Sequence, residues 1–568
     1  MLKGIGASSG IGIGRAVLLR ESEPEIIKRE IAYPDQEAER FLSVLEETKE
    51  ETQKMAGELA QRVGEEEAAI LNAHVMLMSD PSLVDEILKI IKNDKLCAEY
   101  AIESICDQYA MLFASMDDEL MQQRAADMKD IKMRLVKSLL GIKALDLSRL
   151  PEESILVAED LTPSMTAGLD PKKVRGILTK LGGRTSHSAI LSRALEIPAV
   201  VAVHDLIDQV KEGDLICFDG ESAEVHINPE AAKLAEFEGR RADFLKEKKE
   251  LEFYKGKTTV TMDGMRVELA ANIGNPEDAK KALEYDAEGI GLFRTEFLFM
   301  DRNHLPTEEE QFLAYKEVAA LMQGKPVIIR TLDIGGDKEI PYMNIEKDEN
   351  PFLGYRAVRL CLDRKDDLYK PQLRALLRAS AFGDIRIMVP FVSCVEEFRA
   401  VKALIRELMK ELDAASLPYN KETKIGIMVE TAAASLIADL LAKEVDFFSI
   451  GTNDLTQYTM AVDRGNIKVS YLYSTYHPAV LRSIRNIIFA AKEAGITVGM
   501  CGEAASDPKM IPLLLAWGLD EFSMSASAIL RSRKQIMACR KDTLKEIADK
   551  ALSFATEEEV RKYLEEVC

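Results

Sequence analysis

The 568-residue sequence lacks the features that mark membrane or secreted proteins. No apolar run approaches the roughly 20 residues that a membrane-spanning helix needs, and the N-terminus has no apolar signal-peptide core. The eight cysteines are scattered without CxxC spacing, which favours reduced thiols over a disulfide framework. These absences predict a cytoplasmic protein without direct membrane insertion.

Positive charge is scarce relative to negative charge. The chain has 74 Lys and Arg residues against 96 Asp and Glu residues, so its formal net charge is −22. This balance argues against a nucleic-acid partner, which would require a basic surface, and favours a basic protein partner. An anionic substrate would have to be bound by arginines gathered locally. The length predicts about four domains, or one large barrel with smaller units.

A glycine-rich stretch near the N-terminus, Gly6–Gly12, imitates the nucleotide-binding loop of short-chain dehydrogenases. Such a loop must follow a strand and open a helix, yet only a few residues precede it and the strand-like run Ala16–Leu19 follows. No tyrosine has a lysine four residues later, so the catalytic pair of that family is absent. We therefore interpret residues 1–34 as a strand region whose glycine-rich edge strand joins a later sheet.

Residues 35–143 are predicted to form a helical domain, because apolar residues recur at spacings of three and four from Asp35 to about Leu140. Ser79-Asp80-Pro81 is a helix-start signal within it. Residues 35–140 contain 12 Lys and Arg against 23 Asp and Glu, with clusters at Glu65–Glu67 and Asp117–Glu119. A solvated helix face is the usual meaning of such clusters; a docking face for a basic protein is the alternative.

Residues 144–228 alternate short apolar runs with turns, which predicts a small α/β domain. The strand-like runs are Ser154–Ala158, Gly176–Leu178, Ala199–Val203 and Leu215–Phe218. The densely charged residues 229–257 are predicted to form an exposed connecting helix, and so a hinge.

His187 lies at the tip of this α/β domain, in a loop that opens into a helix. Gly182 and Gly183 let the backbone bend, and Ser186 is the expected N-cap, so His187 falls in the first helical turn. The helix N-terminus favours an anion such as phosphate, and Arg184 adds a permanent positive charge. These features predict a phosphorylatable histidine; a structural histidine at a helix start is the alternative.

The C-terminal residues 258–568 show eight strand-like runs that alternate with helical ones, which predicts a TIM barrel. The runs are Val267–Ile273, Gly289–Phe293, Val327–Leu332, Ile385–Val389, Ile425–Val429, Phe447–Ile450, Thr497–Met500 and Glu521–Met524. TIM barrels place their active sites at the C-terminal ends of the strands.

Charged and polar residues gather at those strand ends. They are Arg294-Thr295-Glu296, Arg330, Asp333, Glu430-Thr431, Asn453-Asp454, Arg464 and Cys501-Gly502-Glu503. Arginines suit a carboxylate and a phosphate. Glu430 and Asp454 can hold Mg²⁺, which prefers one or two carboxylates plus substrate oxygens. Ion pairing between these carboxylates and the same arginines is the structural alternative.

With these residues in place, the chain resembles enzyme I of the bacterial phosphoenolpyruvate-dependent sugar phosphotransferase system over essentially its full length. The matching stretches are Gly182–Ala189, Arg124–Asp130, Gly291–Leu298, Leu332–Lys338, Phe447–Tyr458 and Cys501–Glu503. The resemblance implies that phosphoenolpyruvate phosphorylates His187 with Mg²⁺, releasing pyruvate. His187 would then phosphorylate a histidine of the small phosphocarrier HPr, the first step of sugar uptake.

The resemblance also implies roles for individual residues and domains. The substrate-binding residues would be Arg294, Arg330, Asn453, Asp454 and Arg464, and the metal ligands Glu430 and Asp454. Cys501 would protonate the enolate carbon of the product. The chemistry of the attack adds that a hydroxyl of Thr166 or Thr162 would fix which His187 nitrogen attacks, and that Arg184 would help to hold the phosphohistidine. Residues 35–143 would bind HPr, residues 144–228 would swivel as the phosphohistidine domain, and the barrel would form a homodimer.

The chain departs from the family pattern at Ala504-Ala505-Ser506, where a larger apolar residue and an Ala-Gly pair are usual, so we expect altered mobility of the Cys501 loop. Two rival functions share parts of the pattern. Pyruvate-phosphate dikinases and phosphoenolpyruvate synthases also need a large nucleotide-binding domain, for which residues 35–143 are too short and too helical. A regulatory, non-catalytic phosphorelay protein would lack the rim residues, all of which are present here.

Overall fold

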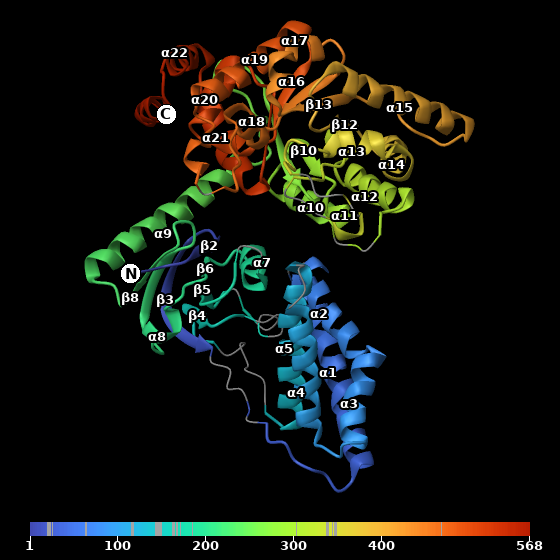
Figure 1. Cartoon of the computed structure of the whole chain (residues 1–568). Coiled ribbons are helices and arrows are strands. Elements are labelled where there is room, and N and C mark those ends of the chain that lie inside the picture. Colours follow the sequence, from blue (N-terminus) through green and yellow to red (C-terminus); the bar gives the residue numbers. More distant parts are fainter. Residues whose placement is uncertain are drawn as a thin grey trace. The chain divides into compact units, whose positions relative to one another are not determined.

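The computed structural model of the chain describes residues 1–19, 24, 26–62, 65–114, 119–142, 150–161, 165, 169–170, 172–183, 186–300, 302, 304–336, 340–343, 345, 349–466 and 468–567. The chain forms two compact units, Met1–Lys248 and Lys249–Cys568, and Figure 1 labels many of their elements. The boundary between the units falls inside helix α9 (Ala231–Glu252). Within the described ranges, every helix is too short or too polar to cross a bilayer.

In its described residues, the first unit contains a bundle of five helices. They are α1 (Pro34–Arg62), α2 (Glu65–Met78), α3 (Pro81–Lys92), α4 (Ala98–Ala114) and α5 (Glu119–Leu139). The predicted helix-start signal is confirmed, because the Asp80 side chain accepts a hydrogen bond from the Ser82 backbone N–H at 2.8 Å and Pro81 opens α3. Of the two acidic clusters, Asp117, Asp118 and the side chains of Glu65, Glu66, Glu67 and Glu119 lie outside the described part of the chain.

The remainder of this unit is built on an eight-stranded sheet. Its strands are β1 (Leu2–Lys3), β2 (Ile5–Ser8), β3 (Ile11–Leu19), β4 (Ser154–Ala158), β5 (Val174–Thr179), β6 (Ala199–Val201), β7 (Leu215–Asp219) and β8 (Glu224–Ile227), in the order β1-β8-β7-β3-β4-β5-β6-β2. Strands β3 to β6 are parallel. The described part of this domain also contains the short helices α7 (His187–Ala194) and α8 (Leu206–Gln209).

The glycine-rich N-terminal stretch corrects one prediction. Strand β2 does lie at the edge of the sheet, but β3 is an interior strand between β4 and β7. β3 has glycines because its neighbours pack closely against it. A Cβ at Gly12 would stand 2.3 Å from the Phe218 ring, and one at Gly14 would stand 2.1 Å from the Glu153 carbonyl oxygen. The glycines therefore let an interior strand pack tightly. A strand and not a helix follows Gly10, so the dehydrogenase reading fails.

The second unit is a closed barrel of eight parallel strands. They are β9 (Glu268–Ile273), β10 (Gly289–Arg294), β11 (Val327–Arg330), β12 (Ile385–Val389), β13 (Ile425–Val429), β14 (Phe447–Ile450), β15 (Thr497–Met500) and β16 (Glu521–Met524). Every predicted strand agrees with an observed one to within two residues at either end. The runs were recognisable because these strands are almost entirely buried and apolar, as parallel strands covered by helices are.

Helices surround this barrel. They are α10 (Pro276–Glu284), α11 (Phe297–Met300), α12 (Glu308–Leu321), α13 (Ala357–Asp363), α14 (Lys370–Ala379), α15 (Val395–Ala414), α16 (Ala432–Leu436), α17 (Ala438–Leu441), α18 (Thr452–Met460), α19 (Pro478–Ala494), α20 (Met510–Trp517), α21 (Ile529–Ala538), α22 (Lys541–Ala551) and α23 (Glu557–Val567). A π-helical turn, Lys365–Tyr369, leads into α14. The predicted multidomain α/β fold is confirmed: a helical bundle inserted between β3 and β4 of a small α/β domain, followed by a (β/α)₈ barrel.

Candidate active site

The residues singled out at the strand ends do lie at one rim of the barrel. Arg294 and Arg330 are the last residues of β10 and β11, Glu430 follows β13, and Cys501 follows β15. Asn453 and Asp454 occupy the first turn of α18, directly after β14. Because all eight strands are parallel, their C-terminal ends meet at the same end of the barrel.

Arg330 is the centre of a buried network of charges at this rim. Its Nη2 donates to Glu296 Oε1 at 2.8 Å, and its Nη1 lies 3.1 Å from Asp333 Oδ2. Burial opposes the charge of Arg330, but the carboxylates of Glu296, Asp333 and Glu430 outweigh it, so its pKa is raised. The guanidinium is held rigidly, and its Nε has no hydrogen-bond partner among the described residues. Arg330 thus keeps a donor for an anion.

A second buried arginine, Arg356, lies at the N-cap position of α13 and was not among the predicted rim residues. Its Nη2 donates to Asp333 Oδ1 at 2.7 Å and lies 3.4 Å from Asp454 Oδ2. Its guanidinium also stacks 4.6 Å from the centre of the Phe391 ring. Arg356 thereby links the acidic residues after β11 and β14. Arg356 lies in a loop far beyond the end of β11, so a search for charged residues directly after each strand does not find it.

Glu430 and Asp454 form the carboxylate pair predicted to hold a metal ion. Glu430 is buried, and its Oε1 accepts the Phe391 backbone N–H at 2.7 Å. Burial raises the pKa of Glu430, and the neighbouring carboxylates of Asp454 and Asp333 raise it further. A Cβ at Gly451 would stand 2.7 Å from Glu430 Oε2, so this glycine keeps space open beside the oxygen.

These features fit a divalent cation. The Asp454 carboxylate adds to the raised pKa of Glu430, a repulsion that a bound cation would relieve, and Arg356 and Arg464 each approach Asp454 only to 3.4 Å. No cluster of three or more potential metal ligands occurs in the described part of the chain. Two carboxylates hold Mg²⁺ when substrate oxygens and waters complete its octahedron, so the donor set matches that ion.

Two residues at the rim adopt a backbone conformation that is unfavourable for them. Phe391 has φ 59°, and Ala357, the residue that follows Arg356, has φ 49°. Both values lie in the left-handed region. The Phe391 conformation presents its N–H to Glu430, and the Ala357 N–H donates to the Ile334 carbonyl oxygen at 3.0 Å. Such strain is concentrated at functional sites in proteins, and here it fixes a carboxylate and an arginine.

Cys501 is almost completely buried at the rim. Its backbone N–H donates to the Ile450 carbonyl oxygen at 3.1 Å, and its carbonyl accepts from Asn272 Nδ2 at 3.1 Å. Burial raises the pKa of the thiol to about 11, although the charge of Arg330 opposes this effect. The thiol is therefore protonated at neutral pH and can donate a proton.

The remaining predicted rim residues are more accessible. Arg294 is exposed, and no carboxylate among the described residues forms an ion pair with it. Arg464 is partly exposed, with Nη1 at 3.4 Å from Asp454 Oδ1. The Asn453 side-chain oxygen lies 3.5 Å from the Glu503 backbone nitrogen, which connects α18 to the Cys501 loop. The rim thus combines rigid buried charges with accessible ones.

The histidine loop lies in the other unit. Helix α7 begins at His187 with Ser186 at the N-cap, as predicted, and Gly182 adopts φ 102°. The expected capping bond is absent, since the Ser186 hydroxyl donates instead to the Gly183 carbonyl oxygen at 2.8 Å. Arg184, Thr166 and Thr162, and the side chain of His187, lie outside the described part of the chain.

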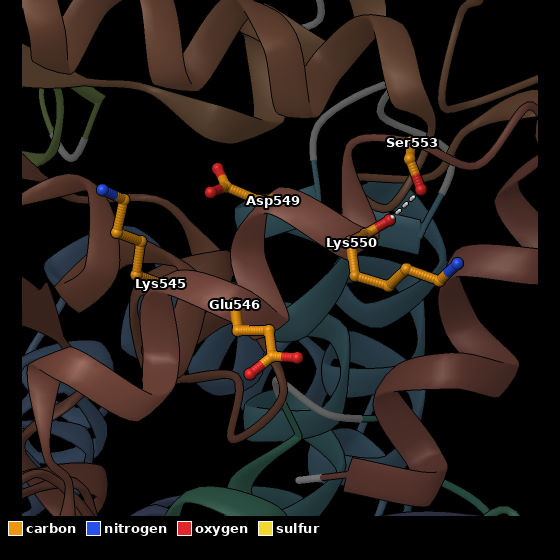
Figure 2. Close-up of a pocket in the computed structure, with 5 residues that line it drawn as sticks. All are labelled: Lys545, Glu546, Asp549, Lys550 and Ser553. Atoms are coloured by element: carbon orange, nitrogen blue, oxygen red, sulfur yellow. Dashed lines mark hydrogen bonds between the residues drawn. The ribbon is translucent and has the colours of Figure 1, made fainter.

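A surface hollow on α22 is unrelated to these residues (Figure 2). Lys545, Glu546, Asp549, Lys550 and Ser553 line it. Figure 2 shows that these side chains point in different directions and do not converge on a common centre. The hollow therefore lacks the converging polar groups of a binding site.

Comparison with known proteins gives consistent matches along the chain. Three family profiles match in order: PEP-utilising enzyme, N-terminal (residues 3–124); mobile domain (150–223); and PEP-binding domain (248–541). Phosphoenolpyruvate-protein phosphotransferase of Staphylococcus carnosus is 47% identical, covering 100% of this chain and 98% of its own. That of Geobacillus stearothermophilus is 48% identical, covering 99% and 97%.

A solution structure of an Enzyme I protein is 39% identical and covers 43% of this chain and 99% of its own, with a TM-score of 0.38. The full-length matches at 47–48% identity decide the assignment. The chain belongs to the family of PEP-utilising enzymes that are named phosphoenolpyruvate-protein phosphotransferases.

Proposed function

We propose that this protein transfers the phosphoryl group of phosphoenolpyruvate to its own His187, releases pyruvate, and then phosphorylates a histidine of the phosphocarrier HPr. The observation that carries the proposal is the barrel rim. It combines arginines, a carboxylate pair and a protonated, buried thiol, in a chain whose relatives carry the name of this activity.

Arginines bind the two anionic groups of phosphoenolpyruvate. Arg330 is fixed by Glu296 and Asp333 and has a spare donor, whereas Arg294 and Arg464 are accessible from solvent. Bidentate contacts from guanidinium groups suit both a carboxylate and a phosphate. Asn453 and Asp454, which open α18, complete the substrate contacts.

Glu430 and Asp454 would hold Mg²⁺ beside the phosphate. When bound, the ion supplies positive charge that neutralises the phosphate oxygens and orients the phosphoryl group. The protein's part is to keep Glu430 Oε2 open beside Gly451 and to hold Asp454 between two arginines at long contacts.

Cys501 completes the chemistry at the carbon end of the substrate. As the bond between phosphorus and the enol oxygen breaks, the electron pair remains on the enolate of pyruvate. The Cys501 thiol, protonated because burial raises its pKa to about 11, gives its proton to the methylene carbon, and pyruvate results. The thiolate then recovers a proton from water, with Arg330 favouring the anion in the interval.

His187 is the phosphoryl acceptor. The imidazole must be neutral, because a protonated ring has no lone pair for attack. A hydroxyl of Thr166 or Thr162 would fix which nitrogen attacks, and Arg184 with the N-terminus of α7 would stabilise the phosphorylated product. Arg184 is assigned from its place beside His187 in the sequence, and the threonines from the hydrogen bond that the attack requires.

The two units must come together for phosphoryl transfer and separate for delivery to HPr. Since the unit boundary falls inside α9, we assign the hinge to this charged helix. The acidic helical bundle is the docking face for HPr. The barrel forms the homodimer. Exposed apolar side chains on helices α16, α17 and α19, which pack on one another, support this assignment: Leu436, Leu440 and Phe489.

Incubation with phosphoenolpyruvate labelled on its phosphate, with and without HPr, tests the function. The expected result is an acid-labile label on the protein, which moves to HPr when HPr is added, with one pyruvate released per phosphate. The reaction should need Mg²⁺ and neither ATP nor AMP. Nucleotide-dependent pyruvate conversion would favour a dikinase or synthase, and absence of labelling would favour a regulatory phosphorelay protein.

A further inference from the structure

Behind the rim, a buried polar network joins the two loops that carry most of the arginine-binding carboxylates. Its centre is Gln372 on α14, which is 1% exposed. The Gln372 Oε1 accepts the Leu332 backbone N–H at 3.0 Å. Its Nε2 donates to Thr295 Oγ1 at 3.2 Å and to the Tyr315 hydroxyl at 3.3 Å.

The hydrogens in this network can be assigned without ambiguity. Leu332 N–H can only donate, so it faces the amide oxygen of Gln372 and fixes the amide orientation. The Thr295 hydroxyl donates its own hydrogen to the Arg330 carbonyl oxygen at 2.9 Å, and the Tyr315 hydroxyl donates to Gln311 Oε1 at 3.1 Å. Both oxygens therefore accept one hydrogen each from the Gln372 NH₂ group. No carboxylate or hydroxyl side chain could make this combination of bonds.

The partners of Gln372 adjoin the rim residues in sequence. Thr295 lies between Arg294 and Glu296 in the sequence. Leu332 directly precedes Asp333 and is separated from Arg330 only by Thr331. Since Glu296 Oε1 accepts both Arg330 Nη2 and the Asp333 backbone N–H, a shift of either loop would move the Arg330 guanidinium. Gln372 itself is on an outer helix that packs on α12 (Figure 1), and none of its hydrogen bonds reaches the rim surface.

We propose that Gln372 is a positioning residue for phosphoenolpyruvate binding, because its side-chain amide locks the loops after β10 and β11 in register and so aims Arg330 and Arg294. The inference rests on the proposed function of the rim. It assigns to an outer helix a part in substrate recognition. Buried hydrogen bonds of this kind are costly to leave unmade, so the two loops hold one arrangement while Gln372 is present.

The test compares Gln372→Met with Gln311→Met in the full-length protein. Gln311 is a matched control, since it is equally buried and shares the Tyr315 hydroxyl, but its other bond is to the Pro306 carbonyl oxygen, away from the rim. Three quantities are measured for each variant: thermal stability, kcat/KM for phosphoenolpyruvate, and the rate at which phosphorylated HPr phosphorylates the protein. The last reaction uses only the first unit.

Gln372→Met should lower kcat/KM for phosphoenolpyruvate by about 10- to 100-fold, the usual effect of misplacing a substrate-binding group by about 1 Å, and leave transfer from phosphorylated HPr unchanged. Gln311→Met should lose stability without this loss of kcat/KM. Equal kcat/KM values for the two variants would overturn the inference.

If Gln372→Met does not fold, Thr295→Val and Thr295→Ser provide the test: only Thr295→Val, which lacks the hydroxyl, should lose kcat/KM for phosphoenolpyruvate. A wild-type protein that is not labelled by phosphoenolpyruvate would refute the proposed function itself.

Discussion

Cys501 shows how a single side chain acquires its chemistry from its surroundings. Its thiol is buried beside the apolar residues Leu292, Met388 and Met428, and burial raises its pKa to about 11. A thiol in this setting stays protonated across the physiological pH range. It therefore suits proton donation, whereas a reactive nucleophilic cysteine needs a lowered pKa.

Replacing Cys501 with Ala should slow pyruvate formation by about 10²- to 10⁴-fold, the usual contribution of a positioned general acid, while phosphoenolpyruvate binding changes little. Steady-state pyruvate release and equilibrium binding measure the two effects. Cys217→Ala is the control, because Cys217 is a fully buried thiol on β7 of the first unit, and burial raises its pKa to about 11 as well. If binding weakened and the rate did not change, Cys501 would have only a packing role.

The raised pKa of Glu521 predicts that the free energy of unfolding depends on pH, independently of catalysis. Burial raises its pKa to about 8, and the nearby carboxylate of Glu268 adds to this effect, while Arg386 opposes it. The pKa of a glutamate in an unfolded chain is about 4.3. Between these values the folded protein binds a proton that the unfolded chain has lost, so the free energy of unfolding falls as pH rises from about 4.3 to about 8.

Glu521→Gln should remove this slope, because an amide does not titrate. The variant should gain stability relative to wild type between pH 5 and pH 8, on the order of a few kcal/mol at about 1.4 kcal/mol per pKa unit. Denaturant titrations at both pH values measure the difference. Parallel stability curves for the two proteins would show that Glu521 is ionised throughout in the folded state.

At the scale of elements, the loop after β15 is held against the start of α18. A Cβ at Gly502 would stand 1.8 Å from Thr452 Oγ1, and the next residues form a 3₁₀ turn, Glu503–Ser506, in which Ala504 and Ala505 are buried. Ala504, which stands where the family usually has a larger apolar residue, thus packs into the barrel with Ala505, and the altered mobility of this loop stays a prediction. The Cys501 loop and the helix that carries Asp454 are one packed assembly.

Gly502→Ala should therefore disturb both Cys501 and Asp454 together. Overpacking of this kind costs about 1–3 kcal/mol of stability, and we expect kcat/KM for phosphoenolpyruvate to fall with it. Gly239→Ala in α9 is the control, since no atom would lie within 4 Å of its Cβ. Wild-type kinetics for Gly502→Ala would mean that the loop moves freely away from α18.

Sequence patterns predicted the elements better than the contacts between them. Each barrel strand was recognisable because it is a short, buried, apolar run, and the strand ends named Arg330, Glu430 and Cys501 directly. Arg356 and Gln372 were missed because they lie in a loop and on an outer helix, where no local pattern distinguishes them. The prediction that Ser186 is the N-cap of α7 is confirmed. Its hydroxyl, however, donates to the Gly183 carbonyl oxygen, because the partner of a serine hydroxyl depends on local geometry and not on residue type alone.

At the scale of the whole molecule, the chain divides its tasks between two units. Ala189 and Leu191 of α7 share a hydrophobic core with Ala56 and Leu71 of the helical bundle, so the histidine helix and the proposed docking domain belong to the same compact unit. The arginines and carboxylates of the rim all belong to the other unit. Exchange with HPr and reaction with phosphoenolpyruvate should therefore be separable.

A fragment of residues 1–248 should accept phosphate from phosphorylated HPr and should not react with phosphoenolpyruvate. It ends at the unit boundary and so includes Phe237 of α9, which is fully buried against Ile13 and Cys217. Transfer from labelled phospho-HPr and from labelled phosphoenolpyruvate are measured side by side, with the intact chain as control. A fragment labelled directly by phosphoenolpyruvate would disprove the division.

The most direct test of the account is to locate the phosphate. The full-length protein and His187→Ala are incubated with labelled phosphoenolpyruvate and Mg²⁺, and the modified residue is identified by mass spectrometry under conditions that preserve phosphohistidine. The account predicts one acid-labile phosphate per chain, on His187, and none on the folded variant. Acid-labile phosphate retained by His187→Ala, or found on another residue of the wild-type protein, would contradict it.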